Sequence, residues 1–128
     1  MRAVASPALL LAAALACGSA RAAPTCLAPH DIPRGAIASP RWLARPVEPE
    51  RFYPETRDLL AAGFCAVLDC RATARGTLTG CTVLSSDPPG AGGAALIMTH
   101  RFRMGRTDAL GRRVAGRPVR VTVAFPTP

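Results

Sequence analysis

The stretch FCAVLDCRATARGTLTGCTVLS, residues 64–85, carries the pattern that decides the fold. In its first half, alternate residues share an apolar face, namely Phe64, Ala66, Leu68 and Cys70. A break that contains Gly76 follows, and a second extended run begins at Thr77. Two such runs joined by a turn that contains glycine predict an antiparallel β-hairpin.

The cysteines on either side of this turn, Cys70 and Cys81, predict a cross-strand disulfide. If Arg75-Gly76 forms a two-residue turn, opposing residues have numbers that sum to 151, which pairs Cys70 with Cys81. Opposed residues have Cα atoms about 4.5–5.5 Å apart, within the range of about 4.4–6.8 Å for a disulfide. In this register Leu78 faces away from Cys81, and a bulge at Gly76 would change the pairing.

The N-terminus predicts export. An apolar run at 8–16 is followed by the small-x-small triplet at 20–22, which is typical of a secretory signal covering 1–22 and cleaved after Ala22. We therefore expect the mature protein in the periplasm. Two alternatives stay open: lipidation at Cys17, or retention of the N-terminal segment as a membrane anchor.

Cleavage would leave four cysteines: Cys26, Cys65, Cys70 and Cys81. An even number in an exported chain predicts disulfides, with three possible connectivities. We favour Cys70–Cys81, which staples the hairpin, and Cys26–Cys65, which ties the N-terminal part to it. Closing a loop of this size could stabilise the fold by about 3 kcal/mol.

The remaining chain predicts a linker, two helices and a last strand. Residues 23–50 are Pro-rich and read as an extended linker, interrupted by Trp42 and Leu43, that could reach about 80–90 Å at about 3.1 Å per residue. A proline start and the glycine at 63 predict a helix over 54–62, and an apolar run predicts another over 92–101. Residues 103–118 are expected to form a loop.

The strongest strand pattern is VRVTVAF at 119–125. Its alternation places one set of side chains inward: Val119, Val121, Val123 and Phe125. It places the other set outward: Arg120, Thr122 and Ala124. The predicted fold class is therefore α+β, a small three-stranded antiparallel β-sheet with two helices packed on it.

The composition and motifs argue against several functions. The net charge is +8, and all 16 basic residues are arginine, but export and the lack of interleaved aromatic residues do not favour nucleic-acid binding. A solvated basic face with weak contact to anionic surfaces is expected instead. His30 and His100 stand alone, so no metal site is predicted. Ser85-Ser86 lacks nucleophile-elbow glycines, so we predict neither catalysis nor a cofactor.

A series of landmarks runs along residues 51–126. They are, in order, Tyr53-Pro54 before a short helix that ends in glycine, the turn glycine Gly76, Leu78, Cys81 and Val83, Ser85-Ser86, an alanine-rich helix ending in HRFRM, Gly116 and a terminal V-x-V-x-V-x-F. Their order and spacing resemble the C-terminal domain of the TonB family. Gly105 departs from the family's usual proline, and Arg75 stands before the turn glycine where the family has aspartate or asparagine.

The resemblance implies a domain that grips an extended peptide of an outer-membrane transporter, or of another envelope protein, by adding it to the sheet edge. Carried over, the partner-binding residues are Tyr53, Pro54, Val119, Arg120, Val121, Thr122, Val123 and Phe125. Energy-transducing members resemble a piston with an uncleaved anchor and a long spacer, whereas this signal reads as cleavable and this spacer is short. A second hypothesis is a disulfide-stapled structural domain of the envelope that forms a homodimer through the same edge.

Overall fold

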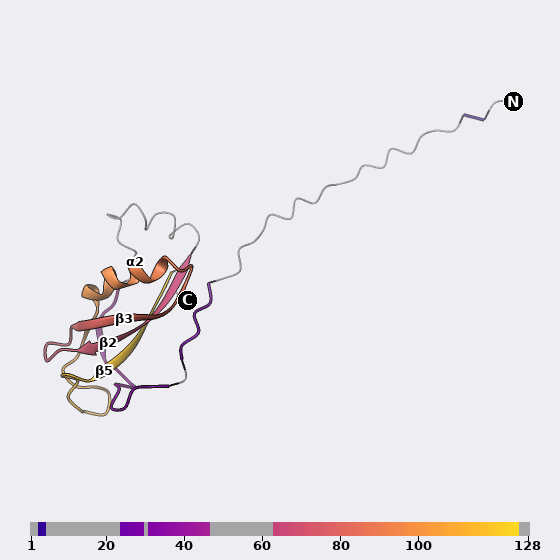
Figure 1. Cartoon of the computed structure of the whole chain (residues 1–128). Coiled ribbons are helices and arrows are strands. Elements are labelled where there is room, and N and C mark those ends of the chain that lie inside the picture. The colour runs from indigo at the N-terminus through magenta and orange to yellow at the C-terminus, as the bar shows by residue number, and fades with distance from the viewer. Residues whose placement is uncertain (1–2, 5–23, 30, 47–62, 126–128) are drawn as a thin grey trace.

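The structure is a computed structural model that describes residues 3–4, 24–29, 31–46 and 63–125 (Figure 1). Its elements follow in this order: β1 (Trp42–Ala44), β2 (Phe64–Ala72), β3 (Leu78–Asp87), α2 (Ala91–Met98), a 3-10 helix η1 (Thr99–Arg101), β4 (Arg103–Met104) and β5 (Pro118–Phe125). They form a three-stranded antiparallel sheet in the order β3-β2-β5 and a two-stranded antiparallel sheet of β1 and β4. The chain is thus a small α+β domain, as the sequence predicts.

The β2–β3 hairpin forms, but its turn differs from the predicted one. The N–H of Thr73 donates to the carbonyl of Thr77 at 2.9 Å, and the N–H of Gly76 donates to the carbonyl of Thr73 at 3.0 Å. The loop therefore has three residues rather than two, and Ala72 pairs with Leu78. The predicted two-residue turn is wrong, because Gly76, with φ of 80°, occupies the left-handed position that ends this type of loop.

A bulge at Gly80 then restores the pairing on which the disulfide depends. The register shifts between Asp69 and Arg71, where Gly80 and Cys81 together oppose Cys70, and Asp69 pairs with Thr82 as the predicted register requires. The disulfide Cys70–Cys81 is confirmed, with its Cα atoms 4.0 Å apart. The extra residue also reverses the alternation along the strand. Leu78 and Cys81 consequently both pack against the core, so the expectation that they face apart is wrong.

The core lies between one face of the large sheet and the elements that cover it, α2 among them (Figure 1). The face of α2 that is buried consists of Ala91, Gly92, Ala95 and Met98, and it is small enough for a close approach to the sheet. A Cβ atom added at Gly92 would lie only 2.9 Å from the side chain of Val83. The predicted helix over 92–101 is present as α2 followed by η1, whereas the predicted helix over 54–62 lies outside the described residues.

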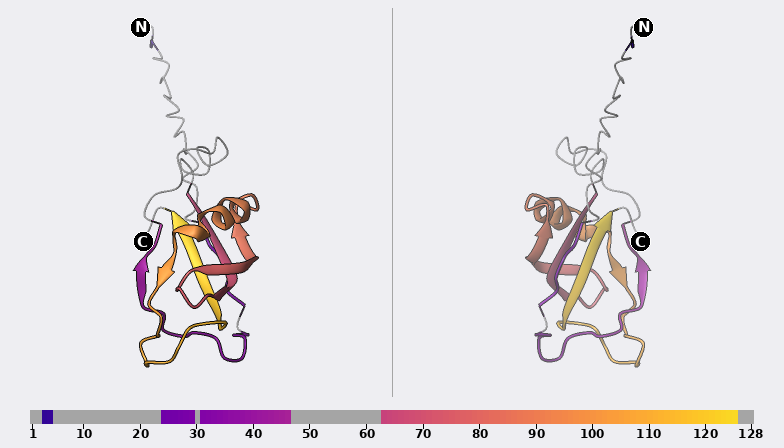
Figure 2. Two further views of the ribbon diagram at one scale, coloured as in Figure 1. Left: turned by 90° about the vertical axis from the view of Figure 1, so that its left-hand side faces the viewer. Right: turned by 90° about the vertical axis from the view of Figure 1, so that its right-hand side faces the viewer.

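The small sheet brings together two short strands that the sequence did not predict. β1 comes from the expected linker and β4 from the expected loop, which is wrong for Arg103–Met104. Figure 2 shows the two strands side by side. The ring of Trp42 packs edge-on against Phe102, with centroids 5.2 Å apart, so the pair is anchored in the core. Strands of two or three residues are too short to show an alternating pattern in the sequence. They form here through pairing between segments that are distant in the chain.

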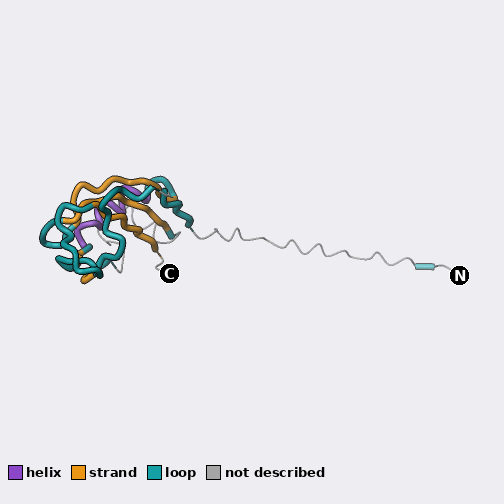
Figure 3. Tube along the Cα trace, turned by 90° about the horizontal axis from the view of Figure 1, so that it is seen from below, coloured by secondary structure: helices purple, strands orange, loops and turns teal. Residues whose placement is uncertain are grey.

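The N-terminal arm, which we define as residues 24–29 and 31–46, is held against the domain. It is mostly loop (Figure 3). Three backbone hydrogen bonds fix it, from Ile37 N–H to the Pro118 carbonyl, from Gly105 N–H to the Arg41 carbonyl and from Ala109 N–H to the Ser39 carbonyl. This part of the predicted linker therefore packs as part of the folded body. The predicted boundary at residue 50 lies outside the described residues.

Candidate functional site

Strand β5 forms one edge of the large sheet, where the sequence placed the candidate partner-binding strand. Its pairing with β2 is unbroken from Phe64↔Phe125 to Arg71↔Pro118. The side chains of Val119, Val121, Val123 and Phe125 are buried, as the alternation predicts. These four residues cannot contact a partner through their side chains, so any recognition at this edge relies on backbone groups and the other face.

The hydrogen-bond pattern divides the backbone groups of β5 into two sets. The N–H of Ala72 on β2 donates to the carbonyl of Arg117 at 3.0 Å, which directs this residue's backbone groups toward β2. Because the direction alternates along an antiparallel strand, the backbone groups of Arg120, Thr122 and Ala124 point away from the sheet. Within the described residues, no backbone–backbone hydrogen bond reaches these outward groups.

The opposite edge, formed by β3, is less regular. Its pairing with β2 shifts twice, between Asp69 and Arg71 and between Val67 and Leu68. Bulges interrupt the row of outward groups and twist an edge away from a neighbouring strand, which is how proteins protect an edge from unwanted pairing. Of the two edges, β5 therefore offers the better template for an added strand.

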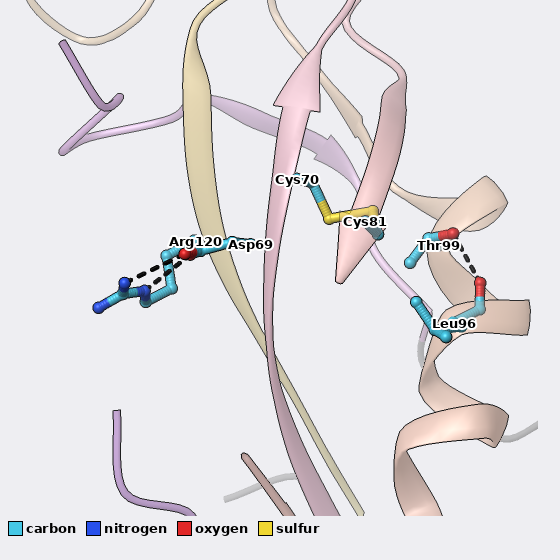
Figure 4. Close-up of a disulfide and its surroundings, with 6 residues drawn as sticks. All are labelled: Asp69, Cys70, Cys81, Leu96, Thr99 and Arg120. Atoms are coloured by element: carbon cyan, nitrogen blue, oxygen red, sulfur yellow. Dashed lines mark hydrogen bonds and ion pairs between the residues drawn. A yellow bond between two sulfur atoms is a disulfide. The ribbon is translucent and has the colours of Figure 1, made fainter. Parts of the chain in front are cut away.

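Arg120 has a role that the sequence did not predict. Its guanidinium forms an ion pair with Asp69, its cross-strand partner on β2, with an Nε–Oδ1 distance of 2.8 Å. It also donates to the backbone carbonyls of Pro29 (2.6 Å) and Asp31 (2.9 Å) in the arm. The hydrogen bond with Asp69 raises the pKa of Arg120 above its ordinary value. Arg120 therefore clamps the arm onto the sheet. Figure 4 shows this pair on one side of the sheet and the Cys70–Cys81 disulfide on the other.

Arg117 makes a second clamp of the same kind. It forms an ion pair with the buried Asp108 at 2.9 Å and donates to the carbonyl of Gly35 in the arm at 3.0 Å. The other carboxylate oxygen of Asp108 accepts the N–H groups of Leu110 (2.9 Å) and Arg112 (3.0 Å). The backbone hydrogen bond from Arg112 and, to a smaller extent, the side-chain hydrogen bond from Arg117 hold the pKa of Asp108 below its ordinary value. The Asp108 carboxylate thus organises the loop that precedes β5.

This arrangement predicts a stability that depends on pH. Because the pKa of Asp108 is lowered by folding, its contribution is present above the unfolded-state pKa of about 3.9 and is lost as the pH falls through the folded-state value. Urea unfolding of the wild type and of Asp108→Asn should therefore show a smaller difference in midpoint at about pH 2.5 than at about pH 6. The matched control is Asp31→Asn, on the exposed arm. An equal pH trend in both variants would contradict the assignment.

The second disulfide, Cys26–Cys65, is also confirmed, with Cα atoms 5.9 Å apart. It joins the arm to the central strand β2, and the N–H of Thr25 nearby donates to Asp87 at 3.0 Å. Two disulfides indicate an oxidising, extracytoplasmic environment. The arm is therefore held at several points along its length, by this disulfide and by both arginine clamps.

Tyr53 and Pro54 lie outside the described residues. Thr122 is exposed and Ala124 is half-buried on β5. In the part of the chain that the structure describes, no three metal-ligating side chains come together, and no helix has the length and apolar character of a membrane span.

A comparison with protein-family models and with curated proteins finds no match.

Proposed function

We propose that the protein is a non-catalytic periplasmic binding module that takes up an extended segment of an envelope protein as an additional strand along β5. The observation that carries the proposal is the regular edge of β5, where Arg120, Thr122 and Ala124 direct their backbone N–H and C=O groups outward. The resemblance to the C-terminal domain of the TonB family points to the same edge and names the partner class, outer-membrane transporters.

The physical basis of this binding is strand addition. Each backbone hydrogen bond formed with a partner contributes about 0.5–1.5 kcal/mol, and the outward groups supply several of them. Selectivity comes from side chains that alternate along the added strand. Since Arg120 is committed to Asp69 and the arm, Thr122 and Ala124 are the β5 side chains left to meet the partner on that face of the sheet.

The clamped arm favours binding over energy transduction. A piston-like transducer needs a long spacer between its anchor and its binding domain, whereas the arm here is bonded to the domain through Ile37, Ser39 and Arg41. The protein is thus proposed to bind or present a transporter segment in TonB-dependent transport, with the force supplied by another component.

Assembly through the same edge is the second candidate. Two β5 strands from two copies can pair antiparallel about a two-fold axis, because such an interface is self-complementary. The two disulfides and the clamped arm fit a rigid structural domain of the envelope equally well. This candidate predicts a dimer in the absence of any peptide.

The substitution Thr122→Pro tests the edge directly. It removes the outward N–H of Thr122 but spares the bonds to β2, so the fold should persist while strand addition is blocked. Amide NMR titration with peptides from the periplasmic segments of outer-membrane transporters should show at least a tenfold weaker Kd than wild type. Thr122→Val keeps the N–H and is the matched control.

The outcomes separate the two candidates. Wild-type peptide binding that is retained in Thr122→Pro would refute the β5 edge as the site. A wild-type dimer that Thr122→Pro converts to a monomer, together with no peptide binding, would favour the assembly role. Sedimentation velocity at several protein concentrations measures the oligomeric state.

A further inference from the structure

Seven exposed arginines lie on neighbouring segments of the chain: on either side of β1, on β4 and the loop that follows it, and in the β2–β3 turn. The pairing of Ala44 with Arg103 joins β1 to β4, and Gly105 N–H bonds to the Arg41 carbonyl. Met104 N–H bonds at 2.8 Å to the carbonyl of Gly76, next to the hairpin turn. We call the arginines on these segments and on the loop after β4 the arginine end: Arg41, Arg45, Arg75, Arg103, Arg106, Arg112 and Arg113. All seven side chains are exposed.

The charge of this end is not neutralised by the carboxylates that the structure describes. Arg117 forms an ion pair with Asp108 and Arg120 forms one with Asp69. Asp31 lies beside Arg120, which donates to its backbone carbonyl. Asp87 accepts the N–H of Thr25 at the other end of β3. None of the seven guanidinium groups forms an ion pair within the described ranges, and Arg45 lies over the ring of Trp42 instead. The seven positive charges therefore produce a strong local field that attracts an anionic partner.

Two leucines stand among these charges. Leu43 lies between Arg41 and Arg45 and is 66% exposed, and Leu110 lies at the tip of the Asp108 loop, two residues before Arg112, and is 69% exposed. The loop around Leu110 is fixed by the two N–H bonds to Asp108. A large apolar side chain held in water beside arginines is typical of protein segments that enter the headgroup region of a membrane.

We propose that the arginine end docks the protein on an anionic lipid bilayer, with Leu43 and Leu110 entering the headgroup region. The proposal concerns a different surface from the β5 edge and does not depend on peptide binding. Anionic headgroups attract clusters of basic residues next to the surface, and the attraction weakens with salt. The leucines distinguish this partner from a nucleic acid, which offers no apolar layer for them.

Sedimentation with sucrose-loaded vesicles provides the test, using the protein purified from the envelope. We expect binding to phosphatidylcholine vesicles that contain about a third phosphatidylglycerol, and loss of that binding at high salt. Arg103→Glu reverses one charge of the arginine end and should weaken vesicle binding about thirtyfold. Arg103→Lys keeps the positive charge at the same position and is the matched control, which should leave vesicle binding nearly unchanged. Leu110→Ser should weaken it without changing the salt dependence.

Three results would overturn the proposal. One is equal binding to vesicles of phosphatidylcholine alone, and another is an equal effect of Arg103→Glu and Arg103→Lys. The third is binding to duplex DNA that exceeds vesicle binding and is unaffected by Leu110→Ser. Circular dichroism confirms in each case that the variant is folded, so that a loss of binding reports on the surface.

Discussion

Replacing Cys26 and Cys65 with alanine is expected to lower the free energy of unfolding by about 4 kcal/mol. The two cysteines are 39 residues apart in sequence, and a longer closed loop restricts the unfolded chain more strongly. Folded domains are stable by only about 5–15 kcal/mol, so the loss would be a large share of the total. Urea unfolding monitored by the fluorescence of Trp42 measures it.

The matched control is the double replacement of Cys70 and Cys81. These residues are only 11 apart, and the same reasoning gives a loss of about 3 kcal/mol. Hydrogen exchange separates the two variants further. Loss of Cys26–Cys65 should speed exchange of the Ile37 amide, which bonds to Pro118, and loss of Cys70–Cys81 should affect it less. A larger cost for the hairpin disulfide would contradict the loop-length argument.

The substitution Gly76→Ala is expected to cost about 4 kcal/mol or to prevent folding. A Cβ atom at this position would lie 1.9 Å from the carbonyl oxygen of Met104, and the backbone φ is 80°. A non-glycine residue pays about 1–2 kcal/mol for the left-handed conformation alone. The clash adds more, because the obstacle is backbone and the hairpin turn must separate from β4 to relieve it.

Gly80→Ala supplies a matched control for this prediction. Gly80 also has a positive φ, of 59°, but a Cβ atom there would meet nothing within 4 Å. Its cost should therefore be limited to the conformational part, about 1–2 kcal/mol. Thermal unfolding of both variants gives the comparison. Equal costs would show that the contact between the turn and β4 does not constrain the fold.

Local patterns in the sequence predicted the strands of the large sheet and the helix after the hairpin. The alternation from Val119 to Phe125 was sufficient for β5, because one face of the strand is buried. The cysteine pairing was also correct, although the assumed turn was wrong. The three-residue loop that ends at Gly76 shifts the strand register by one residue, and the bulge at Gly80 shifts it back. Counting residues from the turn glycine reveals neither shift.

The features that sequence patterns missed all depend on distant partners. β1 and β4 exist because Trp42 packs on Phe102 and Met104 bonds to Gly76. Arg120 was expected to face a binding partner, but Asp69 and the arm carbonyls occupy it. Charge alternation along a strand cannot show which arginine finds a carboxylate on the neighbouring strand. The two clamps instead emerge from tertiary pairing.

The Cys26–Cys65 disulfide has a consequence for the volume that the domain can explore. If the chain were attached to a membrane at Cys17, eight residues would lie between that attachment and Cys26. The chain from Cys17 to Cys26 could then span at most about 30 Å. This is about the thickness of the hydrocarbon core of one bilayer. Opening the disulfide alone would lengthen this tether only as far as Pro29, whose carbonyl Arg120 holds, so that the extended chain would reach about 40 Å. The disulfide therefore sets the shortest tether of any membrane-attached form, and a longer tether requires the arginine clamps and the backbone bonds of the arm to open in turn.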